Sequence, residues 1–260
     1  MRSDSVAVGC SKGVVRLFDA KTLKYVTSLP LPPSLDSINS SSLSAPTSTA
    51  SSAQLPSSRC VRFLPGATKI AVIYSDNSIF LYDLANPNSI GKYRSFIHHS
   101  GPIWDVKCIP LKASSSTTAP PSPRESSDVP EYSFVTTSAD STFRFWNLGV
   151  PGTARITHNR WKNIYSKDLI HCASHPTDDV FRSVAAHPDR SGVAVGDNKG
   201  RIMIFDVNSL SYNKLVNAHD SEVMSLDFSA SGLMASASRD NLVHIFDQKV
   251  SVSESGRVNL

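Results

Sequence analysis

The chain has 260 residues, of which 40% are hydrophobic and 18% are charged. That composition can bury one sizeable core, and it excludes a wholly disordered chain. The formal net charge of +4 at pH 7 is carried by scattered Lys and Arg residues, which argues against a nucleic-acid-binding protein.

The chain also lacks the usual signs of export or membrane insertion. Its first residues, MRSDSVAVGC, hold no apolar stretch long enough for a signal peptide, and no later stretch approaches the ~20 apolar residues that span a bilayer. The four cysteines, Cys10, Cys60, Cys108 and Cys172, are far apart and form no CxxC pair. We expect a cytoplasmic protein with reduced cysteines in its core and no bound cofactor.

Five segments of the chain can be stacked on one another as a repeat. Each consists of two short β-rich runs around a tight polar turn, and each ends in an aromatic residue followed by Asp or Asn. In chain order they are residues 6–19, 70–83, 134–147, 193–206 and 234–247. The last two aromatic residues, Phe205 and Phe246, are about 41 residues apart, within the ~40 to 45 residues of a propeller blade.

Further strand-like runs complete the repeat. Inner strands are predicted upstream of four hairpins, at residues 59–64, 102–109, 180–187 and 222–228, and an outer strand is predicted at 24–29. The repeat unit is therefore a four-stranded antiparallel blade. We predict an all-β fold, an incomplete WD-repeat β-propeller of about five blades, with repeats near 1–29, 59–95, 98–147, 180–216 and 218–248 and with insertions at 34–58, 111–130 and 148–179.

Two repeats carry the polar residues that WD-repeat proteins place in a buried hydrogen-bond network. A loop His, a strand hydroxyl, a turn Asp and a strand Trp indole N–H can satisfy one another where water cannot reach. The third repeat has all four types and the fifth has Phe in the last position: His99, Thr136, Asp140 and Trp146, then His219, Ser236, Asp240 and Phe246. Because Phe has no N–H to donate, we expect the fifth network to be shorter and weaker.

A catalytic triad is the competing interpretation of His, Ser or Thr, and Asp. The chain has no GxSxG sequence, and the trio recurs, which favours a structural role. The first and fourth repeats carry Lys12 and Lys199 where the third and fifth carry the turn Asp. We therefore expect those two blades to be held mainly by apolar packing, and their turns to rely on Gly13 and Gly200 for a positive φ.

Several longer strings resemble one particular family of WD-repeat proteins. They are AVGCSKGVVRLFDAKTLKYVTSLPLP, SSRCVRFLPGATKIAVIYSDNSIFLYDL, NIYSKDLI and AHDSEVMSLDFS followed by LMASASRDNLVHIFD. The chain is similar here to the mitogen-activated protein kinase-binding protein 1 family, which includes WD repeat-containing protein 62. The resemblance implies two propellers and a long tail, so this chain is expected to be a fragment. It also implies scaffolding of JNK signalling, signalling kinases or spindle-pole proteins as partners, and a place at the centrosome or spindle pole.

Three local features suggest binding or modification, each with a simpler interpretation. Ser122 in Pro-Pro-Ser-Pro is a candidate phosphorylation site, although a Ser/Pro-rich loop produces such dipeptides by chance. Residues 159–170 place apolar side chains at near-helical spacing, which could dock a partner but more simply packs on its own blade. His171, Cys172 and His175 lack a fourth ligand for zinc, so we predict no metal site.

The function these observations favour is a non-catalytic protein-interaction scaffold. Direct binding of microtubules or other acidic surfaces is an alternative, for which the positive charge is the support. The rival class is a propeller enzyme with a site in the central channel. The predicted inner strands offer only the scattered ionisable residues Arg62, Asp105, Lys107 and Asp227 for such a site.

Overall fold

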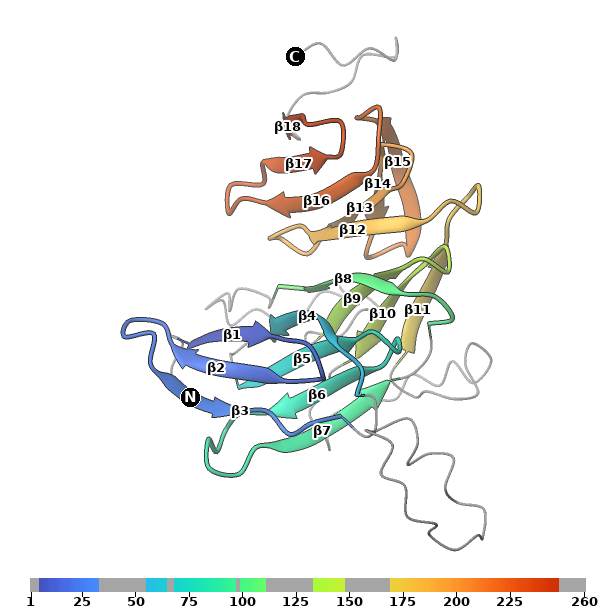
Figure 1. Cartoon of the computed structure of the whole chain (residues 1–260). Helices are drawn as coiled ribbons and strands as arrows, with labels where there is room; N and C mark the ends of the chain where they lie inside the picture. The colour runs from blue at the N-terminus through green and yellow to red at the C-terminus, as the bar shows by residue number, and fades with distance from the viewer. Residues whose placement is uncertain are drawn as a thin grey trace, which may run out of the picture. The chain divides into compact units, whose positions relative to one another are not determined.

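The computed structural model describes residues 5–32, 55–64, 68–96, 99–110, 133–147 and 169–247. Contacts divide the chain into two compact units, residues 1–104 and 105–260. Each regular element among the described residues is a β-strand, and the strands form five antiparallel sheets (Figure 1). We number these sheets as blades one to five in chain order. The structure is that of an incomplete WD-repeat β-propeller.

The first unit holds blades one and two. Blade one has β1 Ser5–Gly9, β2 Val15–Asp19 and β3 Tyr25–Ser28, paired in that order. Blade two has β4 Ser58–Phe63, β5 Lys69–Tyr74, β6 Ile79–Asp83 and β7 Gly91–Phe96. One core of this unit includes Leu17 of blade one and Ile70, Val72 and Tyr82 of blade two. Because successive side chains of a strand point to opposite faces, Ile70 and Val72 share one face of β5, and the intervening Ala71 is buried as well.

The second unit holds blades four and five and most of blade three, whose first strand contains the boundary between the units. Blade three has β8 Ile103–Cys108, β9 Ser133–Ser138, β10 Thr142–Asn147 and β11 Leu169–Ser174. Blade four has β12 Phe181–Ala186, β13 Gly192–Asp197, β14 Arg201–Asp206 and β15 Ser211–Asn217. Blade five has β16 Val223–Phe228, β17 Met234–Ser238 and β18 Val243–Phe246.

The five predicted hairpins are all present with the predicted pairing. In blade two Ile70 pairs with Tyr82, and in blade five Met234 pairs with Phe246. The closing aromatic residue of the hairpin therefore lies opposite its first apolar residue. In blades three and four the aromatic residues also join the blades, because Phe143 contacts Phe205 edge to face at a centroid distance of 5.0 Å.

The predicted insertion at 148–179 extends too far at its C-terminal end. Residues Leu169–Ser174 form β11, which pairs with β10 as the outer strand of blade three. The helix-like spacing of 159–170 ends in this strand, and residues 159–168 lie outside the described part of the chain. The strand was missed because its side chains show little apolar alternation, and the hydrogen bonds to β10 determine its conformation.

The tight turns of the hairpins have the left-handed backbone that the sequence predicts. Gly13 and Gly200 have φ values of 71° and 83°. A Cβ atom on Gly200 would lie 1.9 Å from the carbonyl oxygen of His219, so no other residue fits. Asn77 and Asn241 take the corresponding conformation in blades two and five, as asparagine does more readily than other residues with side chains.

A second glycine position lets neighbouring blades approach each other. Gly9 ends β1 and Gly196 lies near the end of β13, each in the sequence Val-Ala-Val-Gly. A Cβ on Gly9 would lie 2.6 Å from the hydroxyl of Ser58, and one on Gly196 would lie 2.6 Å from Val223. In both cases the contact is with the first residue of the next inner strand, so the missing side chain sets the spacing between blades.

The four cysteines are free thiols, but they are partly or largely exposed and do not form part of the core. The prediction of core thiols was wrong in this respect: Cys10 follows the end of β1, and Cys60, Cys108 and Cys172 take strand positions that remain partly or largely accessible. Within the described residues, no helix is long and apolar enough to cross a membrane.

Candidate functional site

The polar residues of blade five meet around the ring of His219. Its Nδ1 lies 2.9 Å from Oδ2 of Asp240, and its Nε2 lies 2.7 Å from the hydroxyl of Ser236. If Nδ1 carries the proton, it donates to Asp240 while Nε2 accepts from Ser236, and all three side chains are satisfied. Burial opposes ionisation of Asp240, but hydrogen bonds from the Leu242 and Asp220 amides and from His219 outweigh it and hold its pKa at about 2.

Phe246 stands outside this network. Its ring contacts His244 edge to face at 6.2 Å, and His244 stacks on His219 with a centroid distance of 4.4 Å. In blade five, therefore, a second imidazole ring stacks on His219, and the phenyl ring of Phe246 contacts that second ring.

In blade three a hydrogen bond connects the strand tryptophan to the strand threonine. Trp146 donates from Nε1 to the hydroxyl of Thr136 over 2.8 Å, and both side chains are fully buried. Asp140 accepts hydrogen bonds from the amide and hydroxyl of Thr142, at 3.1 and 2.6 Å, and so fixes the turn. His99 is buried ahead of β8, in the first unit.

Blade two uses a pair of tyrosines in the same part of its hairpin. The hydroxyls of Tyr74 and Tyr82 lie 3.1 Å apart in the interior. Burial raises the pKa of both phenols above the ordinary value, so both remain protonated and can share hydrogen bonds. Asp76 closes the turn by accepting from the amide and hydroxyl of Ser78.

Blade four was predicted to be held mainly by apolar packing, but it also contains a buried polar network. His175 lies in the loop before β12, and its Nε2 is 3.2 Å from Oδ2 of Asp197, with both side chains almost fully buried. Oδ1 of Asp197 accepts from the amides of Lys199 and Arg201, each at 2.8 Å. Asp197 thus accepts the turn amides, as the turn Asp does in other blades, although it lies two residues earlier in the hairpin than that position.

An arginine completes the blade-four network. Arg201 Nε donates to Oδ2 of Asp197 over 2.5 Å, and its Nη2 pairs with Asp179. The Nδ1 atom of His175 accepts from the amides of Thr177 and Asp179, at 3.1 and 3.3 Å. Since Nδ1 is an acceptor, Nε2 carries the proton, and burial lowers the pKa of His175 below its ordinary value, so the ring is neutral.

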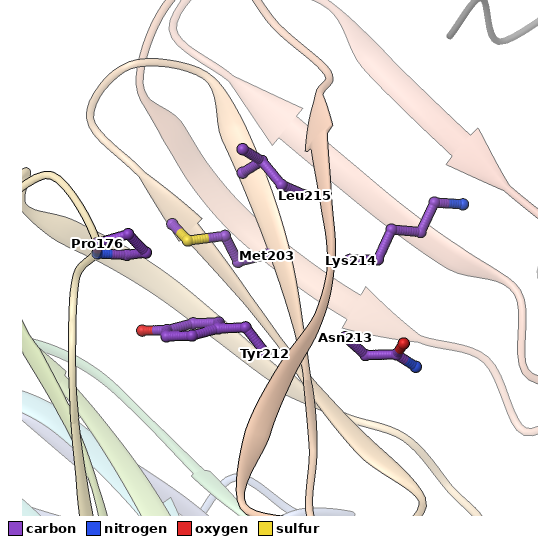
Figure 2. A pocket seen from close by; sticks show the side chains of 6 residues that line it. All are labelled: Pro176, Met203, Tyr212, Asn213, Lys214 and Leu215. Atoms are coloured by element: carbon purple, nitrogen blue, oxygen red, sulfur yellow. The ribbon is translucent and has the colours of Figure 1, made fainter. Parts of the chain in front are cut away.

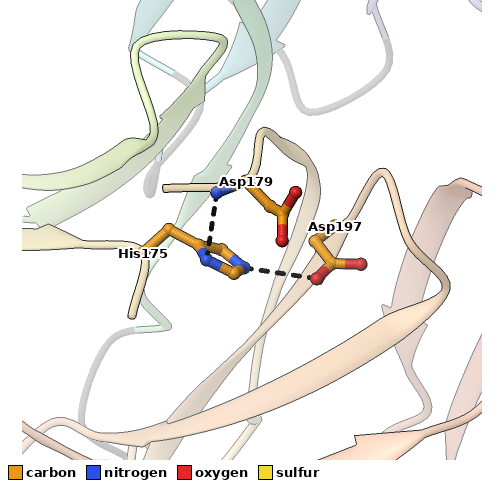
Figure 3. A group of neighbouring side chains, drawn as sticks. All are labelled: His175, Asp179 and Asp197. Carbon is orange, nitrogen blue, oxygen red and sulfur yellow. Dashed lines mark hydrogen bonds and ion pairs between the residues drawn. The ribbon is translucent and has the colours of Figure 1, made fainter. Parts of the chain in front are cut away.

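His175, Asp179 and Asp197 are close enough to be tested as a metal site (Figure 3). One potential ligand atom from each lies within 4.8 Å of the others. However, both ring nitrogens of His175 already have hydrogen bonds, and Arg201 neutralises both carboxylates. A cation would have to displace the guanidinium, so the arrangement fits a structural network better than a metal centre.

His171 and Cys172, the other residues considered as zinc ligands, are not part of that group. Both lie on β11, where neighbouring side chains point to opposite faces of the sheet. The His171 ring packs against Phe205 at a centroid distance of 5.6 Å. The described structure therefore gives these two residues no common ligand site.

The ionisable residues of the predicted inner strands do not gather into a catalytic pocket in the second unit. Asp105 accepts a hydrogen bond from the amide of Val184 at 3.2 Å. Lys107 pairs with Asp227 at 3.2 Å, where the carboxylate is largely exposed. Arg62 lies on β4 in the first unit. The two carboxylates named for a central-channel enzyme thus contact different partners, the amide of Val184 and the ammonium group of Lys107.

A shallow groove lies along the outer strand of blade four (Figure 2). It has a volume of about 200 Å³ and is lined by Pro176, Met203 and residues 212–215. The hydroxyl of Tyr212 donates to the carbonyl of Ser174, which fixes one wall. The candidate phosphorylation site Ser122 lies outside the described residues.

Comparison with known proteins agrees with this architecture. Residues 210–247 match the family described as WD domain, G-beta repeat. That segment covers β15 and the strands of blade five. Together with the five repeated antiparallel sheets, the match defines the chain as a WD-repeat protein.

The similar proteins found place the chain in one family of WD-repeat proteins. Over 94% of its length the chain is 32% identical to human mitogen-activated protein kinase-binding protein 1, and over 92% it is 33% identical to the mouse protein. It is also 28% identical over 92% of its length to pig WD repeat-containing protein 62. The chain belongs to the family of these proteins, and it spans about a sixth of their length, 16 to 17%.

Proposed function

We propose that the chain is part of a non-catalytic scaffold that binds other proteins through loops and strand edges held by its blades. The observation that carries the proposal is the use of its buried polar groups. His175, Asp197 and His219 are each consumed by hydrogen bonds that hold hairpins and loops together. Rigid loops with exposed side chains suit presentation to a partner, as in many binding folds.

The family supplies the class of partner for this proposal. One relative is named for binding a mitogen-activated protein kinase. We propose signalling kinases of the JNK pathway or spindle-pole proteins as partners, in the cytoplasm and at the centrosome or spindle pole. The candidate phosphorylation site Ser122 belongs to the same proposal, as a place where a proline-directed kinase would act.

Binding to microtubules or another acidic surface is the second candidate, supported by the formal net charge of +4. That mode of binding depends strongly on salt, because exposed charges beyond about 10 Å are screened at 0.1 M ionic strength. Apolar docking of a protein partner depends on salt only weakly.

Affinity purification of the full-length protein with and without this region tests the proposal. We expect a set of proteins that is captured only when the region is present and that stays bound at 0.5 M NaCl. Identical captures from the two forms would refute the scaffold role of this region. Loss of all region-dependent captures at 0.5 M NaCl would favour the acidic-surface alternative.

A further inference from the structure

The inner strands of three blades share an irregularity at their second residue. In β4, β12 and β16 the register with the next strand shifts across that position, between Ser58 and Cys60, between Phe181 and Ser183, and between Val223 and Ser225. The residues left over are Arg59, Arg182 and Met224. Such β-bulges turn one side chain away from the regular alternation, and they are frequent next to functional sites.

In the second unit the two bulges lie beside each other. The hydroxyl of Ser183 donates to the carbonyl of Val223 over 2.9 Å, which joins β12 to β16 at this point. Ser183 and Val223 are fully buried, whereas their neighbour Met224 is 53% exposed. An exposed methionine on an inner strand adds nothing to the blade core, so a role in packing within the blade does not explain it.

Two arginines bind the side chain of Glu222, which lies two residues before Met224. Glu222 accepts from Arg182 Nη2 at 3.0 Å and from Arg239 Nη1 at 3.2 Å. The hydrogen bond from Arg182 is the main reason that the pKa of Glu222 lies below its ordinary value, so the carboxylate stays ionised. One carboxylate thus holds two guanidinium groups, and the Arg239 side chain is 70% exposed.

We propose that Arg182, Met224 and Arg239, with Glu222 between the arginines, form a docking surface for an extended segment of a partner protein. The segment carries an apolar side chain flanked by carboxylates. Methionine adapts its shape to an apolar side chain, and a guanidinium binds a carboxylate through paired N–H groups. Methionine and arginine are also enriched in protein interfaces. This inference rests on the proposed scaffold function and names the surface that performs it.

The groove beside β15 provides a matched comparison in the same unit. Leu215 is 56% exposed, which is close to the value for Met224. Lys214 is an exposed cation next to it in sequence, and Arg239 is the exposed cation that pairs with Glu222, two residues before Met224. Substitutions at the two surfaces therefore remove similar apolar area and similar charge.

A random dodecapeptide phage library selected on the immobilised chain 1–260 tests the proposal. Enriched peptides are synthesised with a fluorescein label, and their Kd values are measured by fluorescence anisotropy. We expect an apolar residue flanked by Asp or Glu. Met224→Ser should weaken binding about tenfold and Arg239→Gln several-fold, as for residues central to an interface. Leu215→Ser and Lys214→Gln should leave the Kd unchanged, and all four variants should melt at the wild-type temperature.

Three results would overturn the surface. They are the absence of any enriched sequence, enriched peptides without acidic residues, and binding that is lost in Leu215→Ser or Lys214→Gln instead of in the Met224 and Arg239 variants. Failure of this surface and failure of the scaffold function are distinguishable. If the full-length protein captures region-dependent partners equally well with Met224→Ser and Arg239→Gln, the scaffold stands and this surface does not.

Discussion

Replacing Asp197 by asparagine distinguishes the two sets of hydrogen bonds that its carboxylate oxygens accept in blade four. Oδ1 accepts the amides of Lys199 and Arg201, and an asparagine oxygen can keep both bonds. Oδ2 accepts from the buried ring of His175 and from Arg201 Nε, and there the new NH₂ group would face two donors. The histidine cannot escape by changing tautomer, because its other nitrogen already accepts from the Thr177 amide.

The expected loss follows from these two donors. A buried donor left without a partner costs about 1 to 3 kcal/mol, and a hydrogen bond to a charged group contributes about 1.5 to 3 kcal/mol. We therefore expect Asp197→Asn to lower the free energy of unfolding by about 3 to 5 kcal/mol, in the range found when one partner of a buried ion pair is removed.

Urea unfolding, followed by tryptophan fluorescence, measures this change. A loss of this size shifts the midpoint by about 1 to 2 M at a slope of about 3 kcal/mol/M, the steep end of the usual range for urea, because the slope increases with protein size. Asp206→Asn is the control in the same blade, because the hydrogen bonds that Asp206 accepts come from its own turn, including the amides of Asn208 and Ser209 at 2.8 and 2.7 Å. A loss below about 1 kcal/mol for Asp197→Asn, or equal losses in the two variants, would refute the reasoning.

Three further changes test other parts of the structure. His219→Ala should lower the free energy of unfolding by about 1 to 3 kcal/mol by removing the partner of Asp240, as measured by urea unfolding. Gly196→Ala should lower it by about 1 to 3 kcal/mol because the new methyl overlaps Val223, and thermal melting measures this. The pKa of His175 is lower in the folded state than in the unfolded state, so as the pH falls the unfolded chain takes up the proton before the folded chain does. The free energy of unfolding should therefore be at its full value above about pH 6.5 and should decrease as the pH falls below that value.

For each of these three predictions, one result would contradict the structural reasoning. An unchanged urea midpoint in His219→Ala would contradict the blade-five hydrogen bonds, and a wild-type melting temperature in Gly196→Ala would contradict the tight contact between blades four and five. For the pH series the control is His175→Gln, which should flatten the decline between pH 6.5 and 5. An equal decline in that variant would assign the pH dependence to other groups.

The hairpins could be predicted from the sequence because their two strands alternate or bury apolar residues around a short turn. The outer strands of the blades show a weaker sequence pattern for β-structure than the hairpin strands do. In β15 six of the seven side chains are exposed, so no apolar face marks the strand, and its conformation comes from hydrogen bonds to β14. β11 was placed in an insertion for the same reason.

The polar network of blade four was missed because its residues are displaced from the usual spacing. The expected turn position holds Lys199, whereas the carboxylate sits two residues earlier, at the end of β13. His175 also lies further ahead of its inner strand than His219 does. A search for His followed by Asp that allowed small shifts in both positions would have found the pair.

The close approach at Gly200 makes neighbouring repeats depend on each other. Its carbonyl accepts the amides of Ala218 and His219, at 3.1 and 3.0 Å, and its missing side chain leaves space for the His219 carbonyl. The turn of blade four at Gly200 therefore fixes the backbone of residues 218 and 219, which places the His219 side chain in blade five. A repeat of this protein is not an interchangeable module: exchanging blade four alone would disturb blade five, and a viable exchange would have to carry the following loop with it.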